Sequence, residues 1–470
     1  MIWVLIGYMF LFIHRPFEIW PTLGDIHLER IYMVGALLFA AAWPAKRWIP
    51  NWQHLAYVAF ALVTTICWFC SPWMEQGEET VENFLKILVF YVLVVMAIHD
   101  AKSLRLLLLG FLGVMAVYML HSLREYLGGR YAFRMGFARM IGVDKAMGDP
   151  NTFAASILYT LPFVVPFWKT RGQQTRVSGG VVSGEVGQTL LSGARQECLA
   201  HPFQDSPLAT HHSPPTSLES RESTPSTLMR FFLAGYVSLS VVCIGLTGSR
   251  SAFVGLLLWG VIMVVRSRWR WGLAVLALGC IPVLWGALPD SLQNRFETIV
   301  NPEVGPANAR ESAQNRLEGL EIGLNLWSQY PATGCGPGAW KVATGRKIES
   351  HNLFGQLLGE TGTIGALAFA GILLGFWLNL RRIWQLYREH PEWGRDFLYH
   401  VSTAIGMALF LLLFEGNFGH NLFRYSWLWY GGFLIITRHC VEQRLQTEET
   451  HASSPGVHSA AFRRLAQETA

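Results

Sequence analysis

The sequence predicts an all-α, polytopic membrane protein, and three observations support this fold class. Of its 470 residues, 51% are hydrophobic and only 15% are charged, against roughly 25% charged in a soluble domain. The chain contains 19 Trp and 29 Phe, residue types that gather at bilayer interfaces and in apolar cores. Its apolar runs approach the roughly 20 residues that a helix needs to cross a bilayer. These properties exclude a disordered chain, a disulfide scaffold and a typical cytosolic enzyme, and the net charge of +5 gives no indication of nucleic-acid binding.

About twelve membrane-spanning helices are predicted from the apolar runs. They lie near residues 2–20, 28–45, 52–71, 83–99, 104–122, 151–168, 230–247, 251–265, 271–288, 361–380, 397–414 and 425–438. The chain is thereby divided into a first membrane part (1–171, six helices), an insertion (172–229), a second membrane part (230–288, three helices), an external loop (289–360), a third membrane part (361–438, three helices) and a tail (439–470).

Basic residues in the short loops predict the orientation of these helices, because such residues concentrate on the cytoplasmic side. The basic loops fall on alternate connections, at Lys46–Arg47, Lys102 and Arg105, Lys169 and Arg171, Arg266 to Arg270, and Arg381–Arg382. This alternation predicts that both termini are cytoplasmic. The turn 247–250, the loop 123–150 and the long segment 289–360 then face outward.

Two segments outside the predicted spans differ in character. Residues 172–229 are rich in Ser, Gly, Pro, Thr and Gln with a single aromatic residue, Phe203, which predicts a disordered cytoplasmic insertion. Residues 289–360 keep a helical pattern, since Leu317, Leu320, Leu324 and Trp327 recur at helical spacing, and Ser312 is the expected N-cap. A long loop of this kind usually carries function.

Basic residues on the predicted outer side are the first candidates for chemistry. The loop 123–150 contains Arg124, Arg130, Arg134, Arg139 and Lys145, and arginine binds phosphate through a planar fork of donors. Arg139 is therefore a candidate substrate-binding residue, although solvated arms that contact lipid headgroups explain the pattern equally well. At the end of this loop, Asp149 is expected to cap a helix that begins with Pro150, and Asn151 is a candidate for a cavity-facing residue.

The turn Thr247-Gly248-Ser249-Arg250-Ser251 interrupts two apolar runs. A cation at membrane depth is costly, so Arg250 is expected to have an anionic or backbone partner. Ser249 and the backbone amides that open the next helix are further candidates for anion contact. A snorkelling arginine at a helix end is the alternative explanation.

The segment 289–360 contributes the remaining candidates. Arg316 lies in the first turns of the expected amphipathic helix, where a cation gains nothing from the helix dipole. His351 lies where the external loop meets the membrane, and its imidazole is suited to accept a proton near neutral pH. Asn352 and Glu360 follow, and we expect Glu360 to lie near the same helix face as His351. A structural histidine remains the alternative for His351.

Three motifs together resemble the O-antigen ligase superfamily of bacterial membrane glycosyltransferases. They are TGSRS (247–251), NRLEGLEIGLNLWSQYPATGCGPG (315–338) and SHNLFGQLLGETG (350–362). The resemblance covers roughly residues 230–365, with weaker support from DPN (149–151). Each motif alone is weak, but their order, spacing and shared outward side are specific.

The resemblance implies a GT-C-like fold and the transfer of a glycan from a polyprenyl (undecaprenyl) pyrophosphate carrier to an acceptor hydroxyl outside the bacterial inner membrane, in lipopolysaccharide or other cell-envelope polysaccharide synthesis. It implies that Arg250 and Arg316 bind the pyrophosphate and that His351 is the base. It implies neither a metal nor another cofactor, and the chain has no acidic DxD-type cluster. The acceptor is a lipid, protein or glycan hydroxyl, and direct displacement would invert the anomeric centre. The insertion 172–229 departs from the family, where this link is short.

Three functional classes remain open from the sequence. The first is a glycan transferase, either a ligase or a polymerase. The second is a transporter for lipid-linked glycans, which should show inverted repeats and charges paired within helices, features that the sequence does not display. The third is a non-catalytic assembly subunit, for which His351 would be dispensable.

Overall fold

The computed structural model describes residues 1–134, 137–144, 148–170, 172–173, 222–223, 227–287, 307–346 and 348–453, together with residues 293 and 297. In the N-terminal half the helices are α1 (Ile2–His14), α2 (Pro16–Ile19), α3 (Pro21–Asp25), α4 (Leu28–Ala42), α5 (Gln53–Phe69), α6 (Met74–Ala97), α7 (Ala101–Leu127), α8 (Pro150–Leu158) and α9 (Val164–Lys169), with the 3-10 helix η1 (Leu161–Phe163) before α9. In the C-terminal half they are α10 (Thr227–Thr247), α11 (Arg250–Val265), α12 (Arg270–Ala287), α14 (Ala307–Gln329), α15 (Trp340–Thr344), α16 (Leu353–Glu389), α17 (Phe397–Gly416) and α18 (Tyr425–Ser453), with η2 (Pro391–Trp393) before α17.

The predicted helical membrane protein is confirmed, whereas the number of twelve spans is not. Among the described residues, six helices are long and apolar enough to cross a membrane: Ile2–Ile19, Met74–Ala97, Ala101–Leu127, Thr227–Thr247, Leu353–Glu389 and Phe397–Gly416. Gln53–Phe69 and Arg250–Val265 are apolar but shorter. The all-α prediction also omitted a short antiparallel hairpin of β1 (Ala132–Arg134) and β2 (Phe137–Arg139), and a two-residue pair of β3 (Gly172–Gln173) and β4 (Glu222–Ser223).

Two predicted spans are broken helices. The first, predicted over 2–20, is interrupted at Arg15, whose backbone is left-handed with φ 49°, and Pro16 then begins α2. The sixth, predicted over 151–168, is divided into α8, η1 and α9. Pro162 lies in the short middle piece, and proline removes one hydrogen-bond donor and disfavours an uninterrupted helix.

The helix predicted over 361–380 starts earlier and ends later than the apolar run, because α16 begins at Leu353 and continues to Glu389. At Gly362 the backbone leaves the helical conformation, with φ 62° and ψ −160°, a region that essentially only glycine occupies. Similarly, α14 begins at Ala307, so that Ser312 lies inside the helix and the expected N-cap there is wrong.

Backbone groups around the kink at Gly362 form hydrogen bonds with the loop that follows α14. Since the helical hydrogen bonds are broken there, the carbonyl oxygens of Gly359 and Glu360 accept from the amides of Cys335 and Gly336, at 2.8 and 3.1 Å. The amide of Thr363 donates to the carbonyl of Pro331 at 2.9 Å. These hydrogen bonds tie the turn at 334–338 to the opening of α16.

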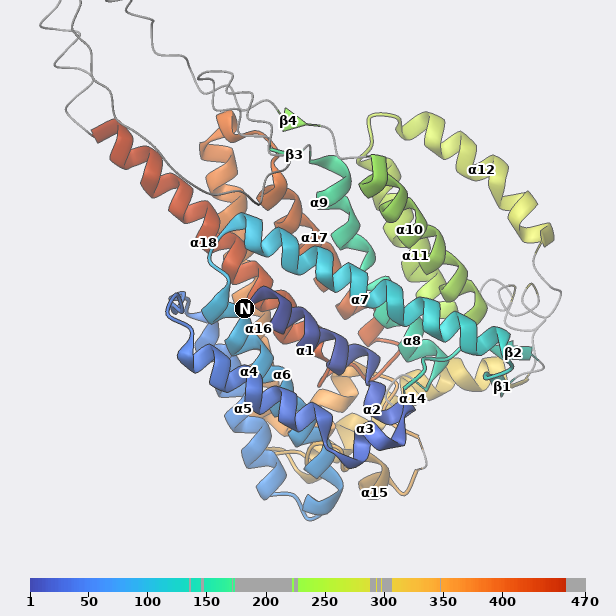
Figure 1. The fold of residues 1–470 in the computed structure, drawn as a ribbon. Helices are drawn as coiled ribbons and strands as arrows, with labels where there is room; N and C mark the ends of the chain where they lie inside the picture. The colour runs from blue at the N-terminus through green and yellow to red at the C-terminus, as the bar shows by residue number, and fades with distance from the viewer. Residues whose placement is uncertain are drawn as a thin grey trace, which may run out of the picture.

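Packing of large side chains unites the bundle into one apolar core. Phe163 lies within 5.8 Å of Phe111 and 5.0 Å of Tyr430, measured between ring centroids, and so joins η1 to α7 and α18. Figure 1 shows α14 lying across one end of the bundle, where β1 and β2 are also found, while β3 and β4 lie at the opposite end. The candidate site lies at the end of the bundle that α14 crosses.

Several predictions fall on residues outside the described part. These are most of the insertion 172–229, the loop residues 289–306 apart from 293 and 297, Lys145, the side chain of Arg134 and the end of the tail from 454. The backbone of α14 is described throughout, whereas the side chains of residues 307–317, including Arg316, are not. Where the tail was predicted to begin at 439, α18 continues to Ser453.

Candidate functional site

The opening of α8 is the first element of the site. The Asp149 carboxylate accepts hydrogen bonds from the amides of Asn151 and Thr152, both at 3.0 Å, and Pro150 occupies the first turn. The predicted helix cap is therefore confirmed. The side-chain oxygen of Asn151 in turn accepts from Nη2 of Arg139 at 2.9 Å.

Arg139 joins the hairpin to the polar turn before α11. Its side chain is only 3% exposed, and Nε donates to the carbonyl oxygen of Thr247 at 2.7 Å. Gly248 has φ 58°, which lets the chain reverse, and Ser249 is fully buried at the N-cap position of α11. Four predicted residues, Arg139, Asn151, Ser249 and Arg250, are thus brought together from three parts of the chain, although two nitrogens of Arg139 are engaged within the protein.

The opening of α16 places His351. The side-chain oxygen of Asn352 accepts from the amides of Phe354 and Gly355 at 2.9 and 3.0 Å, so Asn352 caps the helix. His351 immediately precedes this cap and is half-buried. A histidine held by a capped helix end has a fixed backbone, which favours a defined orientation of its ring.

A glycine-lined crossing brings α14 against α16. A Cβ atom at Gly323 would lie 2.3 Å from the carbonyl oxygen of Gly355, and one at Gly355 would lie 2.2 Å from that of Gly319. Small residues four apart allow helix backbones to approach closely in this way. The Cβ position of Gly319 is also 3.4 Å from the amide nitrogen of His351. Arg316 precedes Gly319 by three residues and therefore lies on the same face of α14.

The segment between α17 and α18 contributes residues that the sequence reasoning missed. The rings of His420 and His351 have centroids 6.1 Å apart. Burial, and then the charges of Arg424 and His351, lower the pKa of His420 to about 3. The available signal is the polar, glycine- and asparagine-rich link Gly416–Arg424 between two apolar runs.

Two buried polar atoms of this segment lack partners among the described residues. They are Nδ1 of His420 and the side-chain oxygen of Asn421, although the Asn421 amide nitrogen donates to the carbonyl of Leu412 at 2.9 Å. Leaving a buried polar atom unpaired costs about 1–3 kcal/mol. Such atoms beside a histidine are expected where a polar ligand binds.

Two adjoining cavities share His420, Arg424 and Tyr425. The smaller, of about 40 Å³, is lined by His351 together with Asn151 and Ser251. The larger, of about 400 Å³, is lined by Glu360 and by further charged residues from α2, α6 and the loops. Glu360 is 1% exposed and accepts from the amide of Gln356 at 3.2 Å. His351 and Glu360 thus line neighbouring cavities.

A comparison with known families matches residues 235–370 to the family described as O-antigen ligase. This match, over residues 235–370, supports membership of the O-antigen ligase superfamily. The match includes Arg250, Arg316, His351 and Glu360 but ends before His420 and Arg424. A comparison with curated proteins finds no significant match.

The match supports, in general, a membrane glycosyltransferase of the O-antigen ligase or polymerase type. The candidate site combines guanidinium groups, a histidine and buried amides, a set suited to an anionic leaving group and a hydroxyl nucleophile.

In the described part of the chain, His390, Glu392 and Glu448 have ligand atoms close enough together to hold a metal ion. Glu448 there already accepts from Trp393 and pairs with Arg444.

Proposed function

We propose that this protein transfers a glycan from a polyprenyl-pyrophosphate carrier to an acceptor hydroxyl, in the manner of an O-antigen ligase. One observation carries the proposal: segments around residues 150, 250, 351 and 420, remote in sequence, meet at one cavity beside His351. The unpaired polar atoms of His420 and Asn421 at this cavity support binding of a polar ligand there.

The proposed donor subsite uses Arg250 and Arg316. As the bond between the anomeric carbon and the pyrophosphate oxygen breaks, its electron pair passes to that oxygen, and negative charge grows on the leaving group. Fixed guanidinium groups stabilise developing charge without reorganisation. Arg250 opens α11 beside the Arg139–Thr247 contact, and Arg316 lies on the helix that crosses α16 next to His351.

In the proposed reaction His351 is the base. A ring nitrogen takes the proton of the acceptor hydroxyl while the hydroxyl oxygen forms the new bond to the anomeric carbon, and this single displacement inverts that centre. The neighbouring His420 has a lowered pKa and is therefore neutral, so it adds no positive charge that would oppose protonation of His351. The proposed reaction requires no metal or other cofactor.

The other candidate residues take supporting roles in this proposal. Arg139 and Asn151 hold the turn before α11 against α8, and Asn352 holds His351 through the cap of α16. Ser249 and Glu360 remain candidates for contact with the substrate, Glu360 from the larger cavity. That cavity is the proposed space for the sugar or acceptor next to the reacting centre.

We further propose that the site faces the periplasm from the inner membrane and that both termini are cytoplasmic. The basic residues assigned to the cytoplasm and the candidate site lie at opposite ends of the same helices. In α11, Arg250 is at one end and Arg266 follows the other. Labelling of single cysteines at positions 268 and 346 in intact cells would test the orientation, with only position 346 expected to be accessible from outside.

Transfer of a polyprenyl-pyrophosphate glycan by the purified, lipid-reconstituted protein tests the function. Loss of a general base costs about 10²–10⁴ in rate, so His351→Ala should lose that much, and Arg250→Ala or Arg316→Ala about 10²–10³. His439→Ala and Arg268→Ala, at half-buried and exposed positions in other elements, are matched controls. Full activity of His351→Ala would exclude the proposed base, and transport without transfer would indicate a carrier instead.

A polymerase is the second candidate function, because the family match extends to both types. Product length separates the two. A ligase attaches one preformed glycan per acceptor, whereas a polymerase yields a ladder of lengths on the carrier.

A further inference from the structure

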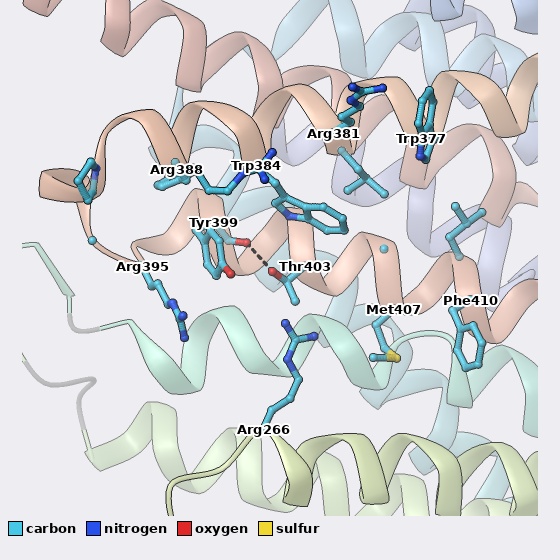
Figure 2. Close-up of a pocket in the computed structure, with 16 residues that line it drawn as sticks. Arg266, Trp377, Arg381, Trp384, Arg388, Arg395, Tyr399, Thr403, Met407 and Phe410 are labelled. Carbon is cyan, nitrogen blue, oxygen red and sulfur yellow. Dashed lines mark hydrogen bonds between the residues drawn. The ribbon is translucent and has the colours of Figure 1, made fainter.

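A third cavity lies far from His351, at the ends of α11, α16 and α17. Its volume is about 990 Å³. Figure 2 shows its two kinds of lining, aromatic and apolar side chains from α16 and α17 and arginines near the helix ends. We call this cavity the arginine groove and define its cationic residues as Arg266, Arg381, Arg388 and Arg395.

The arginine groove lies on the opposite side of the membrane from the candidate site. Arg395 precedes α17 and His420 follows it, and a helix of 20 residues spans ~30 Å, which is the thickness of the hydrocarbon core. On α16, Gly362 and Arg388 are separated by ~39 Å along the helix. The groove is therefore a separate site and not an extension of the cavities beside His351.

Positive charges are crowded at the mouth of the groove. Arg266 and Arg395 come from different elements and point into the space between α17 and α11 in Figure 2. Burial lowers the pKa of the nearby Lys169, and the charges of Arg266 and Arg395 lower it further. In the described part of the chain, no carboxylate lies within ion-pair distance of Arg266, Arg388 or Arg395.

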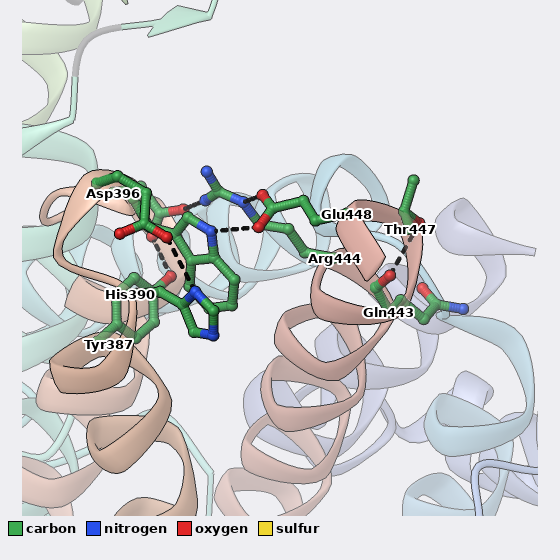
Figure 3. Close-up of polar contacts among 9 residues, drawn as sticks. Tyr387, His390, Asp396, Gln443, Arg444, Thr447 and Glu448 are labelled. Atoms are coloured by element: carbon green, nitrogen blue, oxygen red, sulfur yellow. Dashed lines mark hydrogen bonds and ion pairs between the residues drawn. The ribbon is translucent and has the colours of Figure 1, made fainter. Parts of the chain in front are cut away.

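Three carboxylates at this end of the molecule pair with other cations. Figure 3 shows Arg444 between Asp396 and Glu448, with N–O distances of 3.2 and 3.1 Å. Glu442 pairs with Arg438 at 2.8 Å. Because these acids are engaged, an external anion is the natural partner for the charges of the groove.

Below its mouth the groove is apolar, and several of its side chains are exposed on the surface of the bundle. Trp377 and Trp384 line one wall from α16 and are 51% and 39% exposed, while Phe410 on α17 is 45% exposed. Gly406 leaves room between the walls, since a Cβ atom there would contact Trp384 at 3.6 Å. From Tyr399 to Phe410 the groove follows α17 for ~16 Å, about half of the ~30 Å hydrocarbon core, and so the depth of one leaflet.

We propose that the arginine groove binds an anionic phospholipid of the adjacent leaflet. The headgroup phosphate would pair with Arg266, Arg388 and Arg395, and an acyl chain would lie along Trp384 and Phe410. Arginine suits this contact because its fork binds phosphate oxygens bidentately. A zwitterionic lipid offers the same chain but brings its own cation to the cluster, so we expect the groove to prefer a lipid with net negative charge.

Native mass spectrometry of the full-length protein tests this inference. Phosphatidylglycerol, phosphatidylcholine or inorganic phosphate is added to the detergent-purified protein, and the bound lipid is counted. We expect retention of phosphatidylglycerol at least tenfold above phosphatidylcholine, and no displacement by equimolar inorganic phosphate. The double variant R266Q/R395Q should lose this retention at least tenfold. R268Q/R270Q is the matched control, because it removes two exposed arginines from the same end of the bundle.

Three results would overturn the inference. Equal retention of both lipids would indicate an apolar groove without headgroup selection, and displacement by inorganic phosphate would indicate a site for a free anion. Equal behaviour of R266Q/R395Q and R268Q/R270Q would indicate general surface charge. The thermal unfolding midpoint of each variant, measured in the same detergent, separates loss of binding from loss of fold.

Discussion

The crossing of α14 over α16 makes a quantitative prediction about the candidate site. Gly323→Ala would place a Cβ atom 2.3 Å from the carbonyl oxygen of Gly355 and 2.4 Å from its Cα. Both neighbouring atoms belong to the backbone, so no side-chain rotation relieves the contact. Van der Waals carbon contacts lie at ~3.5 Å, and α14 must therefore move away from α16 by roughly 1 Å.

This displacement should affect stability and activity together. Overpacking in a close-packed region lowers the free energy of unfolding by about 1–3 kcal/mol. Replacing a helical glycine by alanine raises it by about 0.5–1 kcal/mol. Gly371→Ala is the matched control, since it lies in α16 and its Cβ would contact Ala56 at an ordinary 3.6 Å. Relative to this control, we expect Gly323→Ala to lower the free energy of unfolding by about 1–3 kcal/mol.

The functional consequence follows from the position of Arg316 on α14. A displacement of about 1 Å in a reacting group can cost about 100-fold in rate, so glycan transfer by Gly323→Ala should fall about that far below transfer by Gly371→Ala. The assay is initial-rate transfer in reconstituted membranes, with thermal unfolding measured in parallel. Equal unfolding midpoints and equal rates for the two variants would refute the close crossing, and a stability loss without a rate loss would refute the placement of Arg316 in the donor subsite.

Three further predictions concern single positions. Asp149→Ala should cost about 1 kcal/mol through loss of the α8 cap, whereas Asp149→Asn should retain most of the stability, and thermal unfolding would detect the difference. Gly362→Ala should cost about 1–3 kcal/mol, because φ 62° and ψ −160° suit only glycine; an unchanged unfolding midpoint would contradict the kink. The pKa of His420 is lowered from 6.5 to about 3, so the unfolded chain takes up a proton before the folded one does. Stability should therefore be full above pH ~6.5 and fall as the pH decreases toward 3, and His420→Asn should show a smaller fall.

Sequence reasoning located those features whose causes are local. The periodicity of Leu320, Leu324 and Trp327 predicted a helix that the structure contains within α14, and the order Asp149–Pro150 predicted the capped start of α8. Both depend on interactions within one or two turns of the chain, which the sequence specifies directly. The three ordered motifs likewise predicted the superfamily that the match at 235–370 supports.

Features that depend on contacts between distant segments could not be predicted from the sequence. His420 was not a candidate because nothing near it in the chain indicates that its ring lies 6.1 Å from that of His351. The number of twelve membrane spans is likewise not confirmed, because apolar runs of similar composition form helices of different length where a residue such as Pro162 interrupts them.

The sequence by itself determined that the chain is a helical membrane protein, which family its motifs resemble and which polar residues interrupt its apolar runs. These properties follow from composition, short-range periodicity and motif order. Only the tertiary structure decided which interruptions meet, because the contacts of Gly323 with Gly355 and of Arg139 with Thr247 arise from helix packing over long sequence separations. The same packing assigned Arg266 and Arg395 to one groove and Arg250 and His351 to the opposite end of the bundle.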